Sequence, residues 1–207
     1  MRIAKESLPF ALPLGAAGLL AGLLLHPVAA LPPLLLLLFT LWFFRDPDRV
    51  SSAEHDALVS PADGRVLRAD AERISVFMNV FDVHVCRSPM DGRLDEVQRS
   101  PGRFLAAYRD AASEHNERVS LDLAGSDRRL RVTLVAGLVA RRIVLWVSVG
   151  RQLQRGERVG LIRFGSRVDV DLPANSVVAV RPGQRVRAGV TVIARPGAAA
   201  LPGPTAD

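Results

Sequence analysis

The N-terminal part of the chain is one long apolar run. No charged residue occurs between Ser7 and Phe44, and His26 is the only titratable side chain in between. A single helix of about 38 residues would be roughly 57 Å long, whereas the hydrocarbon core of a bilayer is about 30 Å thick. Because Pro27 interrupts helical hydrogen bonding, the pattern predicts a hairpin of two apolar helices, near residues 8–25 and 28–44.

This hairpin is expected to anchor the chain in the cell membrane. A signal peptide is one alternative, since Arg2 and Lys5 precede the run, but the run is far longer than the apolar part of a signal peptide. A hairpin that only dips into the bilayer is another, because each arm is short for a spanning helix. Arg45 and Arg49 follow the run, and the positive-inside rule then places both ends at the cytoplasmic face.

After residue 44 the pattern changes to short β-branched runs separated by Gly, Pro and Asp, as in strands joined by turns. One helix is expected, at 101–112. The predicted strands are 64–67, 74–78, 84–86, 130–135, 143–149, 159–163, 168–171, 176–180 and 190–194. The expected fold class is therefore mainly β (α+β), with a membrane-associated helical hairpin at 1–44 and a β domain at 45–207.

Three segments repeat a turn followed by an apolar strand, at 60–66, 155–162 and 182–193. They resemble the hairpins of biotinyl- and lipoyl-type domains, which indicates a β-sandwich or barrel-like architecture. No Lys lies at a hairpin tip, so a swinging prosthetic arm is not expected and the strands are interpreted as scaffold.

Composition excludes several classes of protein. Cys86 is the only cysteine, which excludes an intrachain disulfide and a four-cysteine zinc site, and the four His residues are scattered, so no metal site is expected. Aromatic residues make up 5%, which argues against a nucleic-acid stacking platform. The net charge of +6 comes almost wholly from Arg. It indicates either a solvated surface or attraction to anionic lipid head groups, and the hairpin favours the lipids.

The common nucleotide-binding, zinc-protease and serine-hydrolase motifs are missing from the sequence. What remains are three polar groups inside apolar surroundings: Asp63 in Pro-Ala-Asp-Gly, His84 between two valines, and the pair Gly165-Ser166 between two apolar segments. Each has an ordinary structural interpretation, namely a turn, a buried strand histidine and a bulge.

In sequence order, however, these segments resemble a known family, the short phosphatidylserine decarboxylases of bacteria and archaea. The resemblance covers nearly the whole chain. It includes Phe-Arg-Asp-Pro at 44–47, 60–66, Phe-Met-Asn-Val-Phe-Asp-Val-His-Val at 77–85 with Arg87, Asn-Glu-Arg at 116–118, and 160–169.

The resemblance implies a lyase that is made as a zymogen and builds its own cofactor, a pyruvoyl group. The Ser166 hydroxyl attacks the Gly165 carbonyl to give an ester, and β-elimination leaves a dehydroalanine that hydrolyses to pyruvoyl. The products are chains 1–165 and 166–207, which form a heterodimer, and a homodimer of that unit is a further assembly. A Schiff base with phosphatidylserine then loses carbon dioxide and yields phosphatidylethanolamine, a step of phospholipid biosynthesis.

The resemblance also implies roles for individual residues. Ser166, His84 and Asp63 are the expected catalytic residues, and His84 and Asp63 are the candidate bases that activate Ser166. Longer members carry a second His where this chain has Arg87, so the identity of the base stays open. Arg87 is assigned to the substrate head group. Arg163 and Arg167 flank the cleavage point and either hold the lipid phosphate or point outward from strands.

Two alternative functions remain. One changes the substrate to another serine-headed lipid, such as archaetidylserine. The other is a non-catalytic, membrane-tethered β-sandwich that binds a partner. An intact chain without a carbonyl group would favour the second.

Overall fold

The computed structural model describes residues 1–54, 56–102, 116–137, 142–163 and 165–197. Most of the helix expected at 101–112 lies outside these residues. The chain divides into two compact units, one made of Met1–Asp48 with Val80–Val83 and the other of Arg49–Asn79 with His84–Asp207.

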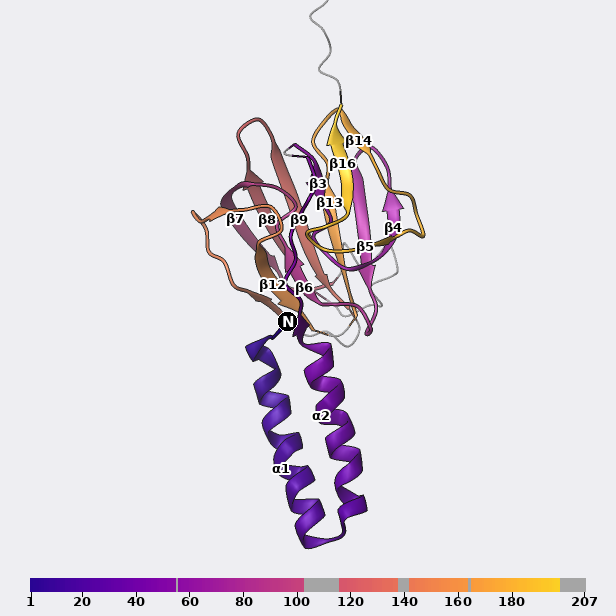
Figure 1. The fold of residues 1–207 in the computed structure, drawn as a ribbon. Helices are drawn as coiled ribbons and strands as arrows, with labels where there is room; N and C mark the ends of the chain where they lie inside the picture. Colours follow the sequence, from indigo (N-terminus) through magenta and orange to yellow (C-terminus); the bar gives the residue numbers. More distant parts are fainter. Residues whose placement is uncertain (55, 103–115, 138–141, 164, 198–207) are drawn as a thin grey trace, which may run out of the picture. The chain divides into compact units, whose positions relative to one another are not determined.

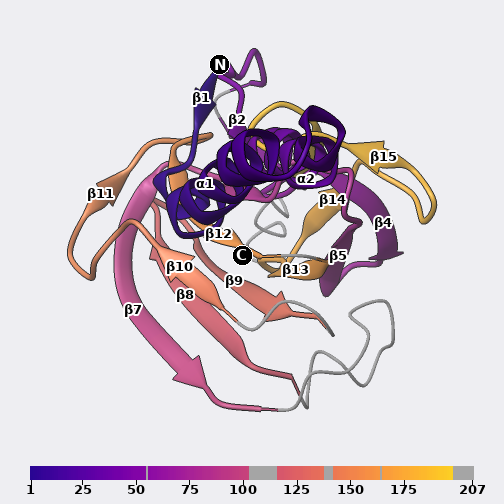
Figure 2. The same cartoon turned by 90° about the horizontal axis from the view of Figure 1, so that it is seen from below.

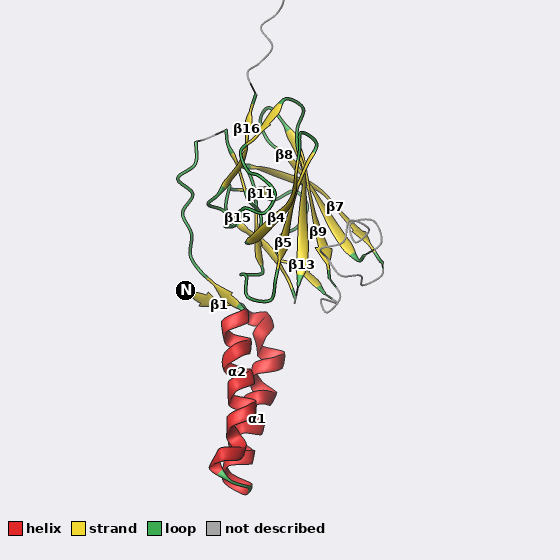
Figure 3. Ribbon diagram, turned by 90° about the vertical axis from the view of Figure 1, so that its right-hand side faces the viewer, coloured by secondary structure: helices red, strands yellow, loops and turns green. Residues whose placement is uncertain are grey.

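The first unit is a helical hairpin closed by a two-stranded sheet (Figures 1 and 3). The break falls at the expected place, since His26 has an extended backbone and its Nδ1 accepts a hydrogen bond from the Val28 N–H at 3.2 Å. The elements in order are β1 (Arg2–Ile3), a 3-10 helix (Lys5–Ser7), α1 (Leu8–Leu24), a second 3-10 helix (Pro27–Ala30), α2 (Leu31–Phe43) and β2 (Arg45–Asp46), which pairs antiparallel with β1.

Glycines on α1 allow the two helices to pack closely. A Cβ on Gly18 would lie 3.0 Å from Leu34 Cδ2, and one on Gly22 would lie 3.4 Å from Ala30 Cβ. Small residues at such spacing are typical of helix pairs in membranes. The leucines on the other sides of the helices are exposed. Lys5–Leu24, with a mean hydropathy of 1.7, is the one helix in the described part of the chain that is long and apolar enough to cross a membrane.

The second unit is built on an antiparallel sheet of eight strands that curls around its core (Figure 2). Its strand order is β11-β7-β8-β9-β13-β5-β4-β15. The bounds are β4 (Gly64–Ala69), β5 (Arg73–Met78), β7 (Gly92–Ser100), β8 (Arg118–Ala124), β9 (Arg129–Ala136), β11 (Gln152–Leu153), β13 (Ser166–Asp171) and β15 (Arg185–Val186).

Two three-stranded sheets complete this unit. One has the order β10-β12-β6, with β10 (Ile143–Leu145), β12 (Arg158–Ile162) and β6 (Val85–Arg87). The other has the order β14-β16-β3, with β14 (Ser176–Val178), β16 (Val192–Pro196) and β3 (Leu58–Val59). All three sheets contribute to one hydrophobic core, for example through Leu58, Ile162 and Val168. The prediction of a mainly β (α+β) fold behind a helical hairpin is confirmed.

Candidate active site

The pair Gly165-Ser166 lies where the chain passes from one sheet to another. β12 belongs to a small sheet and ends at Ile162. After three intervening residues β13 begins as a central strand of the large sheet, with Ser166 opposite both Met78 and Ala136. Gly165 has a φ of 65°, in the left-handed region that strains any residue with a side chain. No atom lies within 4 Å of the position that a Cβ would take there. Backbone conformation, not crowding, therefore favours glycine at 165.

Ser166 is fully buried, and its Oγ has no hydrogen-bond partner in the described part of the chain. A buried hydroxyl without a partner loses its hydrogen bonds to water and gains none in return, which is destabilising. Such groups are rare, and each calls for an explanation such as strain or catalysis. The side chain that the sequence singled out as a nucleophile therefore has no hydrogen-bond partner in the described part of the chain, and it follows a glycine in the left-handed region.

His84 joins this pair from a distant part of the sequence. It is fully buried just before β6, and its Nε2 accepts a hydrogen bond from the Gly165 N–H at 3.2 Å. Its backbone carbonyl accepts another from the Ile162 N–H at 3.2 Å. An Nε2 that accepts is unprotonated, so this contact corresponds to a neutral ring that carries its proton on Nδ1. The structure therefore brings a basic nitrogen next to the Gly165-Ser166 segment.

Asp63 occupies a different environment. Its carboxylate forms a two-pronged ion pair with the Arg49 guanidinium, in which Nη2 lies 2.7 Å from Oδ2, and both side chains are mostly buried. Its Oδ1 also accepts from the Ala188 N–H at 2.8 Å. The described contacts of Asp63 are thus with Arg49 and Ala188, and none is with His84 or Ser166. In the sequence Arg49 stands out only as a charge after the hairpin, and no motif marks it as a partner of Asp63.

Arg87 lines a hollow of about 510 Å³ that is rich in arginine. It is buried, and its Nη1 donates to the Gly156 carbonyl at 2.8 Å. Five arginines line this hollow against one glutamate: Arg49, Arg87, Arg151, Arg155 and Arg158, with Glu157. Because guanidinium groups suit phosphate and carboxylate ligands, we refer to it as the arginine pocket.

Arg163 and Arg167 are not among the residues that line the arginine pocket. Arg167 is buried in the large sheet, where its Nε donates to Asp169 at 2.6 Å and its Nη2 donates to Ser75 Oγ at 2.9 Å. Arg163 is half-buried at the end of β12. The structure thus brings Gly165-Ser166 together with His84. It places Arg87 in the arginine pocket, which Asp63 adjoins through its ion pair with Arg49, and it places Arg167 in the large sheet.

Cys86 is fully buried beside this region. Burial, together with the nearby charge of Asp63, raises the pKa of its thiol to about 12. The thiol therefore stays protonated near neutral pH and is a poor nucleophile. Cys86 is thus a small buried residue of the hydrophobic core.

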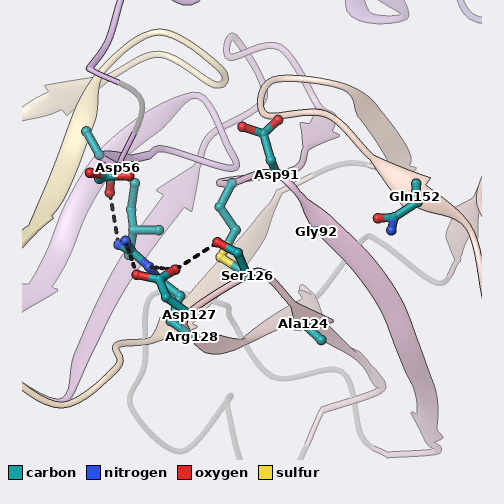
Figure 4. Close-up of a pocket in the computed structure, with 12 residues that line it drawn as sticks. Asp56, Asp91, Gly92, Ala124, Ser126, Asp127, Arg128 and Gln152 are labelled. Atoms are coloured by element: carbon teal, nitrogen blue, oxygen red, sulfur yellow. Dashed lines mark hydrogen bonds and ion pairs between the residues drawn. The ribbon is translucent and has the colours of Figure 1, made fainter.

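Another hollow, of about 440 Å³, carries three carboxylates (Figure 4). Arg128 crosses it, pairing with Asp127 at 2.8 Å and donating to the Asp56 carbonyl at 2.9 Å. No predicted site residue lines it. Among the described residues, no group of three or more His, Cys, Asp or Glu side chains is placed to hold a metal ion.

Comparison with known proteins gives a consistent result. The family model described as phosphatidylserine decarboxylase matches residues 36–72 and 68–194. A phosphatidylserine decarboxylase proenzyme of Symbiobacterium thermophilum is 49% identical over 207 residues, covering 93% of this chain and 95% of the relative. A proenzyme of the same name from Solibacter usitatus is 46% identical, and the alignment covers 94% of this chain and 97% of the relative. Another, from Syntrophus aciditrophicus, is 44% identical, with 90% of this chain and 94% of the relative covered.

The family model spans most of the chain, and the three relatives align over almost their full length. Both comparisons indicate the same family. The chain belongs to the phosphatidylserine decarboxylase family.

Proposed function

We propose that this chain is the precursor of a phosphatidylserine decarboxylase that cuts itself between Gly165 and Ser166 and converts Ser166 into a pyruvoyl group. One observation carries the proposal. The Ser166 Oγ is buried without a partner next to Gly165, and the Gly165 N–H is bound by the unprotonated Nε2 of His84. A nucleophile, a base and an unhindered carbonyl are what this self-cleavage needs.

In the self-cleavage, the Ser166 Oγ attacks the Gly165 carbonyl carbon and its proton passes to His84. The peptide C–N bond breaks, the nitrogen takes a proton, and an ester joins Gly165 to the Ser166 side chain. Loss of the Ser166 Cα proton then breaks the Cβ–Oγ bond, which frees the Gly165 carboxylate and leaves dehydroalanine. Water replaces the nitrogen of this residue, giving ammonia and the pyruvoyl group. His84 is the base in this scheme, since Asp63 is bound to Arg49.

The surroundings of Ser166 fit a pyruvoyl group, because the site is buried, close to a titratable imidazole and free of competing hydrogen-bond partners in the described part of the chain. The ketone of that group supplies an electron sink for the loss of a carboxylate from an amino-acid head group. In this reaction His84 would return a proton to the carbon that loses carbon dioxide. Arg87 and the arginine pocket would hold the anionic part of the lipid head group.

After cleavage the two chains would remain together as a heterodimer. β13 belongs to the short chain, and it pairs along its whole length with β5 and β9 of the long chain. Its Val168 and Val170 are fully buried in the shared core. Separation would remove a central strand from the large sheet, so the cut is expected to leave the fold intact.

We further propose that the hairpin anchors the enzyme at the cytoplasmic face of the cell membrane. The leucines on the outer sides of α1 and α2 are exposed, including Leu19, Leu23 and Leu35, which is unfavourable in water and favourable in a bilayer. The substrate is a membrane lipid, so anchoring keeps enzyme and substrate in the same two-dimensional phase.

The test is the intact mass of the purified protein under denaturing conditions. We expect two chains, 1–165 and 166–207, the short one lighter by one ammonia than the unmodified peptide, and release of carbon dioxide from phosphatidylserine in vesicles. Ser166→Ala and His84→Ala should each leave one chain of 22.4 kDa without activity. Ser176→Ala, which changes another serine of the short chain, should cleave normally. Normal cleavage and activity in Ser166→Ala would refute the proposal.

A further inference from the structure

Phe81 has an unusual place for a large apolar side chain. It lies in the loop Val80–Val83 between β5 and β6, and 65% of its surface is exposed. Among the described residues it is the most exposed aromatic side chain. Single exposed apolar side chains are common on protein surfaces, so the contacts of Phe81 decide whether its exposure has a function.

The loop is bound to the C-terminal end of α2. The Phe81 ring lies edge-on to the Trp42 ring with centroids 6.1 Å apart. Arg45 holds both residues, since its Nη2 donates to the Phe81 carbonyl at 2.7 Å and its Nη1 donates to the Trp42 carbonyl at 2.9 Å. Its guanidinium carbon also lies 3.9 Å from the centre of the Trp42 ring. The loop therefore belongs to the same compact unit as the hairpin.

These contacts define the depth of Phe81 if the hairpin lies in a bilayer. α2 is apolar up to Phe43, and charge returns at Arg45, so the boundary between hydrocarbon and head groups falls at this end of the helix. Trp residues at helix ends occupy that interfacial layer, which also accommodates other aromatic rings. Phe81 is in direct ring contact with Trp42 and must lie at nearly the same level.

We propose that Phe81 inserts into the interfacial layer of the bilayer and that the loop Val80–Val83 is a second membrane contact, close in the chain to the active-site histidine. The proposal rests on the membrane anchoring proposed above. Its partner is the lipid surface itself, reached by an apolar ring. The loop carries Asp82, whose carboxylate anionic lipids would repel, so the contact is not electrostatic.

The position of this contact matters for catalysis. His84 is only three residues beyond Phe81. Three residues of extended chain span at most about 11 Å, so the Cα of His84 lies within that distance of the Cα of Phe81. Insertion of Phe81 would thus hold the histidine of the active site close to the head-group layer. A lipid could then present its head group without leaving the leaflet.

Fluorescence quenching tests the depth of Phe81 independently of activity. Phe81→Trp is made in the full chain with Trp42→Phe and Trp146→Phe, and the protein is reconstituted in phosphatidylcholine vesicles that carry quenchers at known depths. We expect the indole introduced by Phe81→Trp to be quenched most by shallow quenchers. In the same background, the indole of Leu20→Trp should be quenched most by deep quenchers. Val149 is an exposed position of the β unit, so the indole of Val149→Trp should not be quenched by any of them.

The outcomes separate the two proposals. If Leu20→Trp is quenched and Phe81→Trp is not, the loop lies outside the membrane and this inference is overturned, while the anchoring stands. If neither is quenched, both fail.

Kinetics give a second measurement. Phe81→Ser should raise the apparent KM for phosphatidylserine in vesicles by about tenfold, with a much smaller change for a monomeric short-chain phosphatidylserine, because only the first substrate requires interfacial binding. The value of kcat on vesicles should change little. Val149→Ser is the matched control and should change neither substrate's kinetics. Equal losses on both substrates would show that Phe81 acts only through the structure of the loop and would overturn the inference.

Discussion

Gly165 and Gly183 share a left-handed backbone, with φ values of 65° and 86°, and in neither case does an atom lie within 4 Å of the position of a Cβ. The strain that alanine would introduce is therefore alike at both sites. Only Gly165 precedes Ser166 and donates its N–H to His84. The two glycines thus have the same backbone conformation and differ in the residues beside them. An effect of backbone strain can therefore be separated by experiment from an effect on self-cleavage.

Gly165→Ala and Gly183→Ala should each lower the free energy of unfolding by about 1 kcal/mol, because each places a Cβ in the left-handed region. Stability is measured by denaturant unfolding in a Ser166→Ala background, so that every variant is one chain. With Ser166 present, Gly165→Ala should slow self-cleavage on a gel time course, while Gly183→Ala should cleave at the wild-type rate. Equal cleavage rates in the two variants would count against the role assigned to Gly165.

Among the elements, β13 shows most clearly why local pattern is an incomplete guide. Its sequence, Ser-Arg-Val-Asp-Val-Asp, alternates as a strand with one solvated face does. In the structure both faces are covered, and Arg167 and Asp169 are each about 3% exposed as an ion pair. By contrast, the ion pair between Arg131 on β9 and Asp122 on β8 is half-exposed. The hydrogen bond from Arg131 lowers the pKa of Asp122.

Asp169→Ala should lower the free energy of unfolding by about 3–5 kcal/mol, because it leaves the buried charge of Arg167 without its partner. Asp122→Ala breaks the more exposed pair with Arg131 and is the matched control. It should lower the free energy of unfolding by less than about 1 kcal/mol. Both are measured by denaturant unfolding in the Ser166→Ala background. A loss below about 1 kcal/mol for Asp169→Ala would show that the buried ion pair contributes little to stability.

Two further strands show the limits of pattern. The sequence pattern does not predict β7, since a register shift between Leu94 and Glu96 interrupts the alternation of apolar residues. The strand expected at 168–171 begins at Ser166 instead, so the serine belongs to the strand. That difference explains why its side chain is buried.

The whole molecule combines an apolar hairpin with a β unit rich in arginine, and either part could attract it to a membrane. The two modes differ in their response to salt. Interactions between exposed charges are strongly screened at 1 M salt, where the Debye length is about 3 Å, whereas burial of the exposed leucines is not weakened by salt.

We therefore expect the full chain to float with liposomes in a density gradient equally well at low and at 1 M salt. Leu20→Arg places a charge on α1 roughly 18 Å along the helix from Leu8, near the centre of a bilayer about 30 Å thick. Such a charge costs about 2.5–3.5 kcal/mol on insertion and should reduce flotation. Val149→Arg adds the same charge to the β unit and should not. Release of the wild-type chain by salt alone would show that the arginine surface, and not the hairpin, holds it to lipid.

The sequence by itself determined the apolar hairpin with its break at His26-Pro27 and most of the strands. Through the family resemblance it also named Gly165-Ser166 and His84 as candidate site residues. These features are local or lie in contiguous motifs, because helix and strand periods are written in neighbouring residues. Only the tertiary structure decided that His84 meets Gly165, that Asp63 pairs with Arg49, and that Phe81 packs on Trp42. Each of these contacts joins segments far apart in the chain, and strand register and the crossing between sheets, which no local pattern encodes, bring them together.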